Sequence, residues 1–156
     1  HAQPLSGIDF HRVGIHLGCS LHFQLTLRAH DKLALGADRR AAADRYLREI
    51  RHPEVRLPVV RPEAEPVWHI FAVRCARRQA LERHLASCGI QTGRHYPVPI
   101  HRQPCYGDLN LPEGSLPIAE EISRTELSLP MYYGMTPEEI GAVVAAVNSF
   151  PAEGAL

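Results

Sequence analysis

One short stretch in the middle of the chain, TGRHYPVPIHRQPCY (residues 92–106), concentrates side chains that can take part in chemistry. It holds three prolines, two histidines and two tyrosines. Each proline removes a backbone donor and fixes φ, and it also favours an extended residue before it. The stretch therefore predicts a stiff, extended loop rather than a central strand. Such a loop can present polar rings at the edge of a binding site, although a surface crossing without a binding role is the simpler interpretation of this stretch taken alone.

A metal site is the second chemical interpretation of the same stretch. His95, His101 and Cys105 follow one another with a His-x5-His-x3-Cys spacing. Three ligands at this unfamiliar spacing make a weak zinc signature, and it is the weakest of the functional interpretations. The four cysteines of the chain show neither close pairing nor regular spacing, so we expect free thiols.

Length and charge bound the class of protein. The 156 residues suit one domain, and 45% hydrophobic residues are enough for a core. Seventeen basic residues balance seventeen acidic ones, which gives no electrostatic reason to expect nucleic acid or a membrane surface as a partner. No apolar run approaches the length of a membrane span and no signal pattern opens the chain, so we expect a cytoplasmic protein.

The elements that must position the loop follow from hydrophobic periodicity and capping residues. The clearest is a helix opened by Thr136 as N-cap, with Glu139 completing a capping box. Gly89 suits a left-handed C-cap, whereas Gly36 could break the first helix. Helices are predicted at 25–51, 77–88, 115–125 and 136–150, and extended segments at 55–60, 67–74, 90–96 and 127–130. This order indicates an α+β fold, with a small, largely antiparallel sheet covered by helices.

Three motifs in order resemble one known family. They are VWHIFAVR, then GIQTGRHYPVPIHRQPCY, then LPIAEEISRTELSLPMYYGMTPEEIGAVVAAVNSF. The set resembles the C-terminal small domain of the DegT/DnrJ/EryC1/StrS family, the pyridoxal-phosphate-dependent aminotransferases of sugar nucleotides. On this resemblance, residues 38–156 form the small domain. Residues 1–37 form an irregular segment and the start of a long helix, and they have drifted from the family pattern.

The resemblance implies a fold-type-I aminotransferase, in which a large domain holds pyridoxal phosphate and the small domain closes one side of the cleft. It implies that Tyr96 and His101 face substrate or cofactor, with a sugar nucleotide as substrate. The missing large domain or a second copy of the chain would be the protein partner. His69 is expected to be structural, with its imidazole paired to a loop carbonyl.

Two departures from the family pattern matter. The chemistry requires a lysine that forms a Schiff base with the cofactor, but the only lysine, Lys32, lies in a helical context. We therefore assign no catalytic residue and expect no covalent binding of pyridoxal phosphate by this chain. In the family, an asparagine reaches the cofactor phosphate from a Gly-x-Asn-x-Arg-Leu-Asp stretch. His16 stands in its place here and could still donate to a phosphate, but Gly18 replaces the arginine.

Two functions remain open beside the metal site. The chain is the C-terminal portion of a sugar-nucleotide aminotransferase, inactive by itself, or it is a non-catalytic interaction or oligomerisation module with the same fold. In the first case, a flank that faces the large domain should be apolar and exposed. We expect it to include five side chains: Leu21, Phe23, Leu25, Val98 and Ile100.

Overall fold

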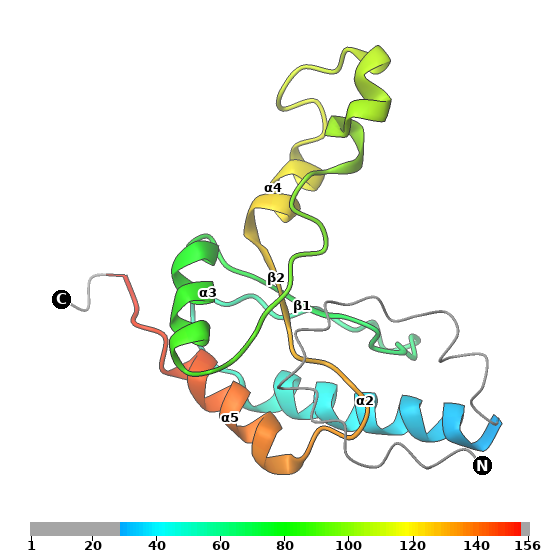
Figure 1. The fold of residues 1–156 in the computed structure, drawn as a ribbon, viewed down its shortest axis with the longest axis vertical. Helices are drawn as coiled ribbons and strands as arrows, with labels where there is room; N and C mark the ends of the chain where they lie inside the picture. Colours follow the sequence, from blue (N-terminus) through cyan, green and yellow to red (C-terminus); the bar gives the residue numbers. More distant parts are fainter. Residues whose placement is uncertain (1–28, 154–156) are drawn as a thin grey trace, which may run out of the picture. The chain divides into compact units, whose positions relative to one another are not determined.

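The computed structural model describes residues 29–153, with side chains from Gly36 onward. The architecture below is that of the unit that begins at Ala34, together with the first turns of the helix that leads into it. Its ribbon is drawn in Figure 1. No helix in the described part of the chain is long and apolar enough to cross a membrane.

The fold is α+β, as the sequence predicts. All four predicted helices are present, and they are joined by two short 3-10 helices that the sequence did not indicate. In chain order the elements are α2 (Ala29–Glu49), β1 (Phe71–Arg74), α3 (Arg78–Ser87), η1 (Ile100–Arg102), η2 (Pro104–Leu109), α4 (Pro117–Thr125), β2 (Glu126–Leu129) and α5 (Pro137–Asn148).

The sheet is smaller than predicted. Strands β1 and β2 pair antiparallel, with Phe71 opposite Leu129. The expected strands at 55–60 and 90–96 each contribute a single antiparallel bridge, one on each outer edge of the pair, at Arg56 and Gly93. The antiparallel prediction is thus confirmed, but the predicted strand lengths are wrong.

Backbone conformation explains the shortening of the strand predicted at 67–74. Trp68 has φ of 47°, which takes the chain out of the extended region, so pairing begins only at Phe71. Pro58 has no N–H to offer a neighbouring strand, and this limits the segment at 55–60 to its bridge at Arg56.

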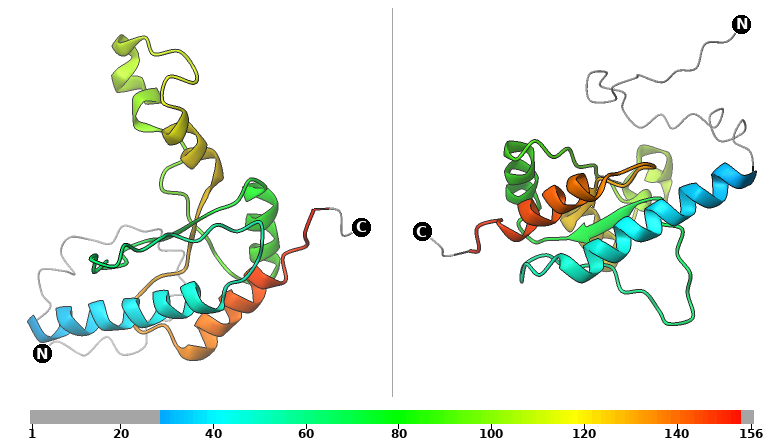
Figure 2. Two further views of the ribbon diagram at one scale, coloured as in Figure 1. Left: turned by 180° about the vertical axis from the view of Figure 1, so that it is seen from behind. Right: turned by 90° about the horizontal axis from the view of Figure 1, so that it is seen from below.

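Helices α2 and α5 lie side by side on the same side of the sheet (Figures 1 and 2). The Tyr46 ring of α2 packs edge-on against Phe71 at 5.0 Å between centroids, and its hydroxyl donates to Pro130 O at 3.0 Å. At the far end of α2, Asn148 Nδ2 donates to Glu49 O at 2.9 Å. The predicted apolar stripe of α5 is buried, and it comprises Ile140, Val143, Val144 and Val147, followed by Phe150.

Both predicted helix caps are confirmed. Thr136 Oγ1 accepts from Glu139 N at 3.2 Å, and Glu139 Oε2 accepts from Thr136 N at 2.8 Å. At the end of α3, Gly89 has φ of 77°, and Ile90 N donates to Leu85 O at 2.9 Å. Because glycine alone adopts this conformation without strain, Gly89 ends α3 where the sequence predicts.

Two smaller expectations fail. Helix α2 continues through Gly36 without a break. His69 is exposed, and among the hydrogen bonds between described residues none involves its imidazole, so the expected pairing to a loop carbonyl is not found.

The fold yields a matched stability test. Val147→Ala removes two methyl groups from a fully buried position of α5, and we expect a loss of about 2 kcal/mol in the free energy of unfolding. Val59→Ala makes the same change at a residue that is 94% exposed, and it should cost less than about 0.5 kcal/mol. Urea denaturation of both variants measures the difference, and equal losses would contradict the core described here.

Candidate functional site

The site is built by one connection, residues 93–116, which we call the site segment. It leaves the edge of β2 at Gly93, passes through η1 and η2, and returns to α4. The prediction of an extended conformation holds for Pro99, which has φ −64° and ψ 149°, and for Gln103, which has φ −74° and ψ 148°. It is wrong for η1 and η2, because the φ fixed by a proline also suits the first position of a helix, where Pro104 stands.

Strand β2 anchors the start of the segment. Gly93 N donates to Ser128 O at 3.0 Å, and Ser128 N donates to Gly93 O at 2.8 Å. Two residues further on, His95 N donates to Glu126 Oε2 at 2.8 Å, and His95 Nδ1 lies 2.8 Å from Ser128 Oγ. The peptide bond between His95 and Tyr96 is cis. Backbone and side chain of His95 are therefore both held by residues of β2.

Helix α4 anchors the rest of the site segment through one carboxylate, that of Glu120. Glu120 Oε1 lies 3.1 Å from His101 Nε2 in η1. The same carboxylate accepts from Gly114 N at 2.9 Å, and it caps the first turn of α4 through Leu116 N at 3.5 Å. The side chains of His101 and Glu120 are only 6% and 8% exposed. Glu120 thus ties both halves of the site segment to the helix that follows it.

These bonds favour the ionised form of Glu120. The Gly114 N–H and then the His101 imidazole hold the pKa of Glu120 below its ordinary value, although burial opposes this effect. The carboxylate is the form that accepts several donors at once. The site segment is therefore held by an ionised side chain.

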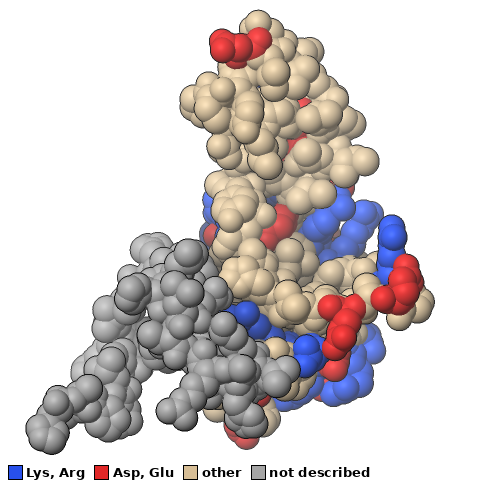
Figure 3. Space-filling view, turned by 90° about the vertical axis from the view of Figure 1, so that its right-hand side faces the viewer, with Lys and Arg blue, Asp and Glu red and all other residues tan. Residues whose placement is uncertain are grey.

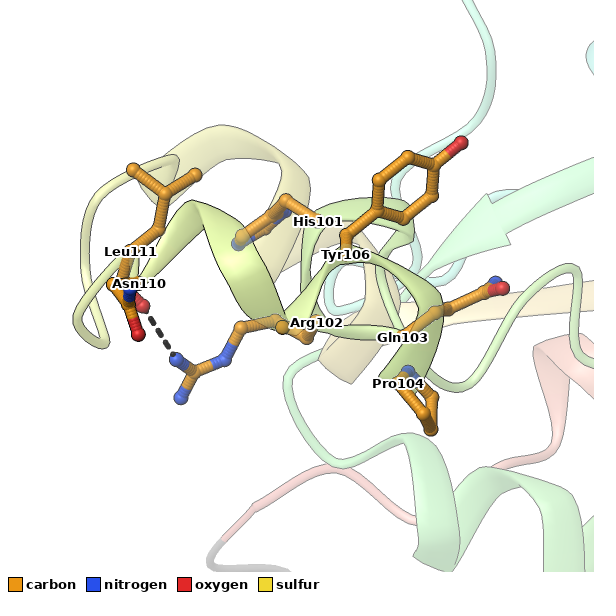
Figure 4. Close-up of a pocket in the computed structure, with 8 residues that line it drawn as sticks. His101, Arg102, Gln103, Pro104, Tyr106, Asn110 and Leu111 are labelled. Atoms are coloured by element: carbon orange, nitrogen blue, oxygen red, sulfur yellow. Dashed lines mark hydrogen bonds between the residues drawn. The ribbon is translucent and has the colours of Figure 1, made fainter.

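A hollow of about 450 Å³ opens on the outer side of η1 and η2 (Figure 4). Arg102 crosses it and donates from Nη1 to Leu111 O at 3.1 Å. Gln103 and Tyr106 lie on its other side and point away from Arg102. The hollow has no buried charged group that would bind an ion, because His101, on its wall, is already paired with Glu120.

The three predicted site residues, Tyr96, His101 and His16, have different outcomes. Tyr96 is 67% exposed, with its ring edge-on to the ring of His95 at 5.5 Å. His101 turns inward to Glu120, so its Nε2 already has a partner. His16 lies outside the described residues. Tyr96 and His101 share one segment, but only Tyr96 offers its polar group to solvent.

The metal interpretation finds no support in the described part of the chain. Among residues 29–153 no group of three or more His, Cys, Asp or Glu side chains could hold a metal ion. His95 is hydrogen-bonded to Ser128, His101 is hydrogen-bonded to Glu120, and Cys105 is exposed.

Sequence reasoning missed the three residues that anchor the site segment. The sequence places Glu120 only in a predicted helix and Ser128 only in a predicted extended segment, and Glu126 falls between the two. One signal was available, because Glu126 is a charged residue in the four-residue strand ELSL, whose residues are all buried. Buried carboxylates need partners, and such a position points to a hydrogen-bonded network.

A comparison with known families decides the kinship. Residues 27–148 match the model of the DegT/DnrJ/EryC1/StrS aminotransferase family. The chain belongs to this family. The match includes the whole site segment, together with both of the elements that anchor it.

Curated relatives show the same kinship over part of their length. The chain is 49% identical over 113 residues to the dTDP-3-amino-3,4,6-trideoxy-alpha-D-glucose transaminase of Streptomyces venezuelae. It is 40% identical over 114 residues to the erythromycin biosynthesis sensory transduction protein EryC1 of Saccharopolyspora erythraea. Each match covers 72% of this chain, but only 30% and 31% of the respective relative. The chain thus spans about a third of the length of these family members.

Solved structures agree. DesV of S. venezuelae, determined with a ketimine intermediate, superposes with a TM-score of 0.71 at 42% identity, over 74% of this chain and 31% of DesV. A family aminotransferase from Brucella abortus has a TM-score of 0.67 at 23% identity, which supports the fold alone. The predicted fold, that of a small domain of fold-type-I aminotransferases, is confirmed.

Pyridoxal phosphate is the cofactor of the family, but the described residues 29–153 do not make its site. The chemistry needs a lysine, and the only one, Lys32, lies in α2 near its N-terminal end. The site segment supplies imidazole and phenol groups, and the carboxylates of Glu126 and Glu120, which face it, are already bonded to donors of the segment. We therefore derive no catalytic step through the cofactor.

Glu120→Gln tests the anchor through its pH dependence. The pKa of Glu120 is lowered in the folded state, so its contribution to stability is present above about pH 4.5 and is lost as the pH falls through the lower folded pKa. We expect the variant to unfold at lower urea concentration near neutral pH, and the gap to the unmodified protein to close in acid.

Glu113→Gln is the matched control, because Glu113 is an exposed carboxylate of the same segment. It should leave the urea midpoint nearly unchanged at neutral pH. A gap between Glu120→Gln and the unmodified protein that is constant with pH would contradict the role of an ionised Glu120.

Proposed function

We propose that this chain forms the small-domain, C-terminal portion of a pyridoxal-phosphate-dependent sugar-nucleotide aminotransferase, and that it borders the active-site cleft without carrying the cofactor. The observation that carries the proposal is the site segment, which is fixed at both ends and lies within the family match. The coverage of about a third of each relative supports a contribution from one domain rather than a whole enzyme. A cytoplasmic location would suit this activity.

Within that cleft, Tyr96 is the residue we assign to substrate. Its hydroxyl can donate and accept, and the ring is exposed while the preceding residue is held by β2. His101 then acts as a positioning residue, since it holds η1 through Glu120 rather than offering a free nitrogen. His16 remains a proposed phosphate donor on the family resemblance.

The remainder of the protein, or a second copy of the chain, would cover the apolar surface around the site segment. Val98 is 45% exposed and Ile100 is 69% exposed, as expected for that flank. Leu21, Phe23 and Leu25 lie outside the described residues. On the face drawn in Figure 3, the part built by η1, η2 and the start of α4 shows hardly any Lys or Arg. Such a surface suits a protein interface.

An interaction or oligomerisation module is the second candidate. Lys32 is the single lysine of the sequence and lies in α2, which favours this candidate. The exposed apolar surface also favours it. One relative, 34% identical over 115 residues, is a pleiotropic regulatory protein of Geobacillus stearothermophilus. Activity in the presence of a cofactor domain separates the two candidates.

A chimera supplies that domain. Residues 38–153 replace the matching segment of the S. venezuelae transaminase, to which the chain is 49% identical. We expect the chimera to bind pyridoxal phosphate and to transaminate the substrate of that enzyme. Tyr96→Ala in the chimera should lower kcat/KM by about tenfold or more, because a hydrogen bond to substrate is lost.

Tyr133→Ala is the matched control, since Tyr133 is also an exposed tyrosine, at 56%, and lies outside the site segment. It should change kcat/KM less than about twofold. A chimera that binds the cofactor but is inactive would favour the interaction module, and equal effects of the two substitutions would remove Tyr96 from the site.

The chain alone should not react with the cofactor at a specific lysine. After incubation with pyridoxal phosphate and reduction with borohydride, we expect no stoichiometric label at Lys32, because nothing in the family pattern places a helical lysine of α2 at the cofactor. Peptide mapping by mass spectrometry measures the label. Stoichiometric modification of Lys32, accompanied by transamination, would show that this chain carries its own active site.

A further inference from the structure

Three side chains of the site are hydrogen-bonded in series. Ser128 Oγ donates to Glu126 Oε1 at 2.5 Å, and Ser128 Oγ also lies 2.8 Å from His95 Nδ1. The other carboxylate oxygen, Oε2, accepts from His95 N at 2.8 Å. Glu126 and Ser128 are 3% and 5% exposed, so water does not compete for these bonds.

Counting protons fixes the tautomer of the imidazole. A serine hydroxyl has one proton, and Ser128 gives it to the Glu126 carboxylate. Ser128 Oγ can then only accept from His95, so Nδ1 must carry the hydrogen. In a neutral imidazole the second nitrogen, Nε2, is left as an acceptor.

The ring is also held by packing. A Cβ atom on Gly93 would come within 2.9 Å of His95 Cε1, so the ring lies directly over the Gly93 backbone. The Tyr96 ring meets it edge-on. Among the hydrogen bonds between described residues, none involves His95 Nε2. The half-buried imidazole thus has one bonded nitrogen and one nitrogen without such a bond.

We propose that Ser128 and Glu126 are positioning residues which lock His95 in the Nδ1–H tautomer and so present Nε2 as a hydrogen-bond acceptor to a hydroxyl group of the ligand. The acceptor favours a hydrogen-bond donor beside Tyr96 over an anion, because an unprotonated nitrogen offers no hydrogen to a phosphate. The identity of that hydroxyl as one on the sugar of a sugar nucleotide rests on the proposed function, whereas the tautomer does not.

Nitrogen-15 NMR of the imidazole reads the tautomer directly and needs no ligand. The spectrum is recorded on the whole chain at about pH 8.5, where an ordinary histidine is neutral, and His95→Gln identifies the signal. We expect His95 as the Nδ1–H form. Ser128→Ala should shift the ratio of the two tautomers by about fivefold towards Nε2–H, the factor that one typical hydrogen bond is worth.

Ser123→Ala is the control, because Ser123 is a buried serine of α4 whose hydroxyl donates to Pro97 O at 3.4 Å rather than bonding to His95. It should leave the tautomer ratio unchanged. A His95 imidazole that is Nε2–H or doubly protonated in the unmodified chain would overturn the proposal, as would an equal shift in both serine variants.

The ligand is tested separately in the chimera, with dTDP-glucose and dTDP as probes. Ser128→Ala should weaken binding of dTDP-glucose by about fivefold and leave dTDP binding unchanged, because only the first probe carries the hydroxyls of a glucose ring. Equal weakening of both probes would overturn the assignment of the hydroxyl. Failure of the unmodified chimera to bind either probe would count against the proposed function, while the NMR result would still decide the tautomer.

Discussion

The structure of the site depends on buried acceptors at one place in the chain. Glu120, Glu126 and Ser128 lie where α4 runs directly into β2, and their oxygens bond to the site segment. Buried oxygens that lack donors would cost several kcal/mol, so the fold requires the segment to bring its donors to them. None of the apolar side chains of the segment is buried, and these polar bonds decide its path.

The core plays a different part. Tyr46, Phe71 and the α5 stripe hold β1, β2 and the helices together by burial, and none of these residues belongs to the site segment. The packed unit fixes the position of β2, and β2 then fixes His95. Tyr96 is the next residue in the chain, so the backbone that carries its exposed ring is held in place by the buried strand β2. This division explains how a segment with large exposed apolar residues can still present a defined surface.

Much of the fold could be predicted from local patterns. Periodicity and the caps at Gly89 and Thr136 located the helices, because these signals depend on neighbours within one turn. The 3-10 helices could not be predicted, since a proline such as Pro104 permits both extended and helical continuations. The anchors were missed for another reason. The bonds from His95 to Ser128 and from His101 to Glu120 join residues far apart in the sequence, and no spacing rule reports which buried carboxylate will meet which donor.

The separation of anchors from exposed residues has a consequence for how such a segment can change during evolution. The carboxylates and the serine that hold it lie after residue 116, outside the segment itself. Positions such as Val98, Ile100 and Tyr106 take no part in those bonds and are exposed. Selection can therefore vary the surface that meets a ligand or a partner while the frame stays constant. A change of preference needs only point substitutions between the anchored residues, whereas loss of the Glu120 carboxylate removes support from His101, Gly114 and Leu116 together.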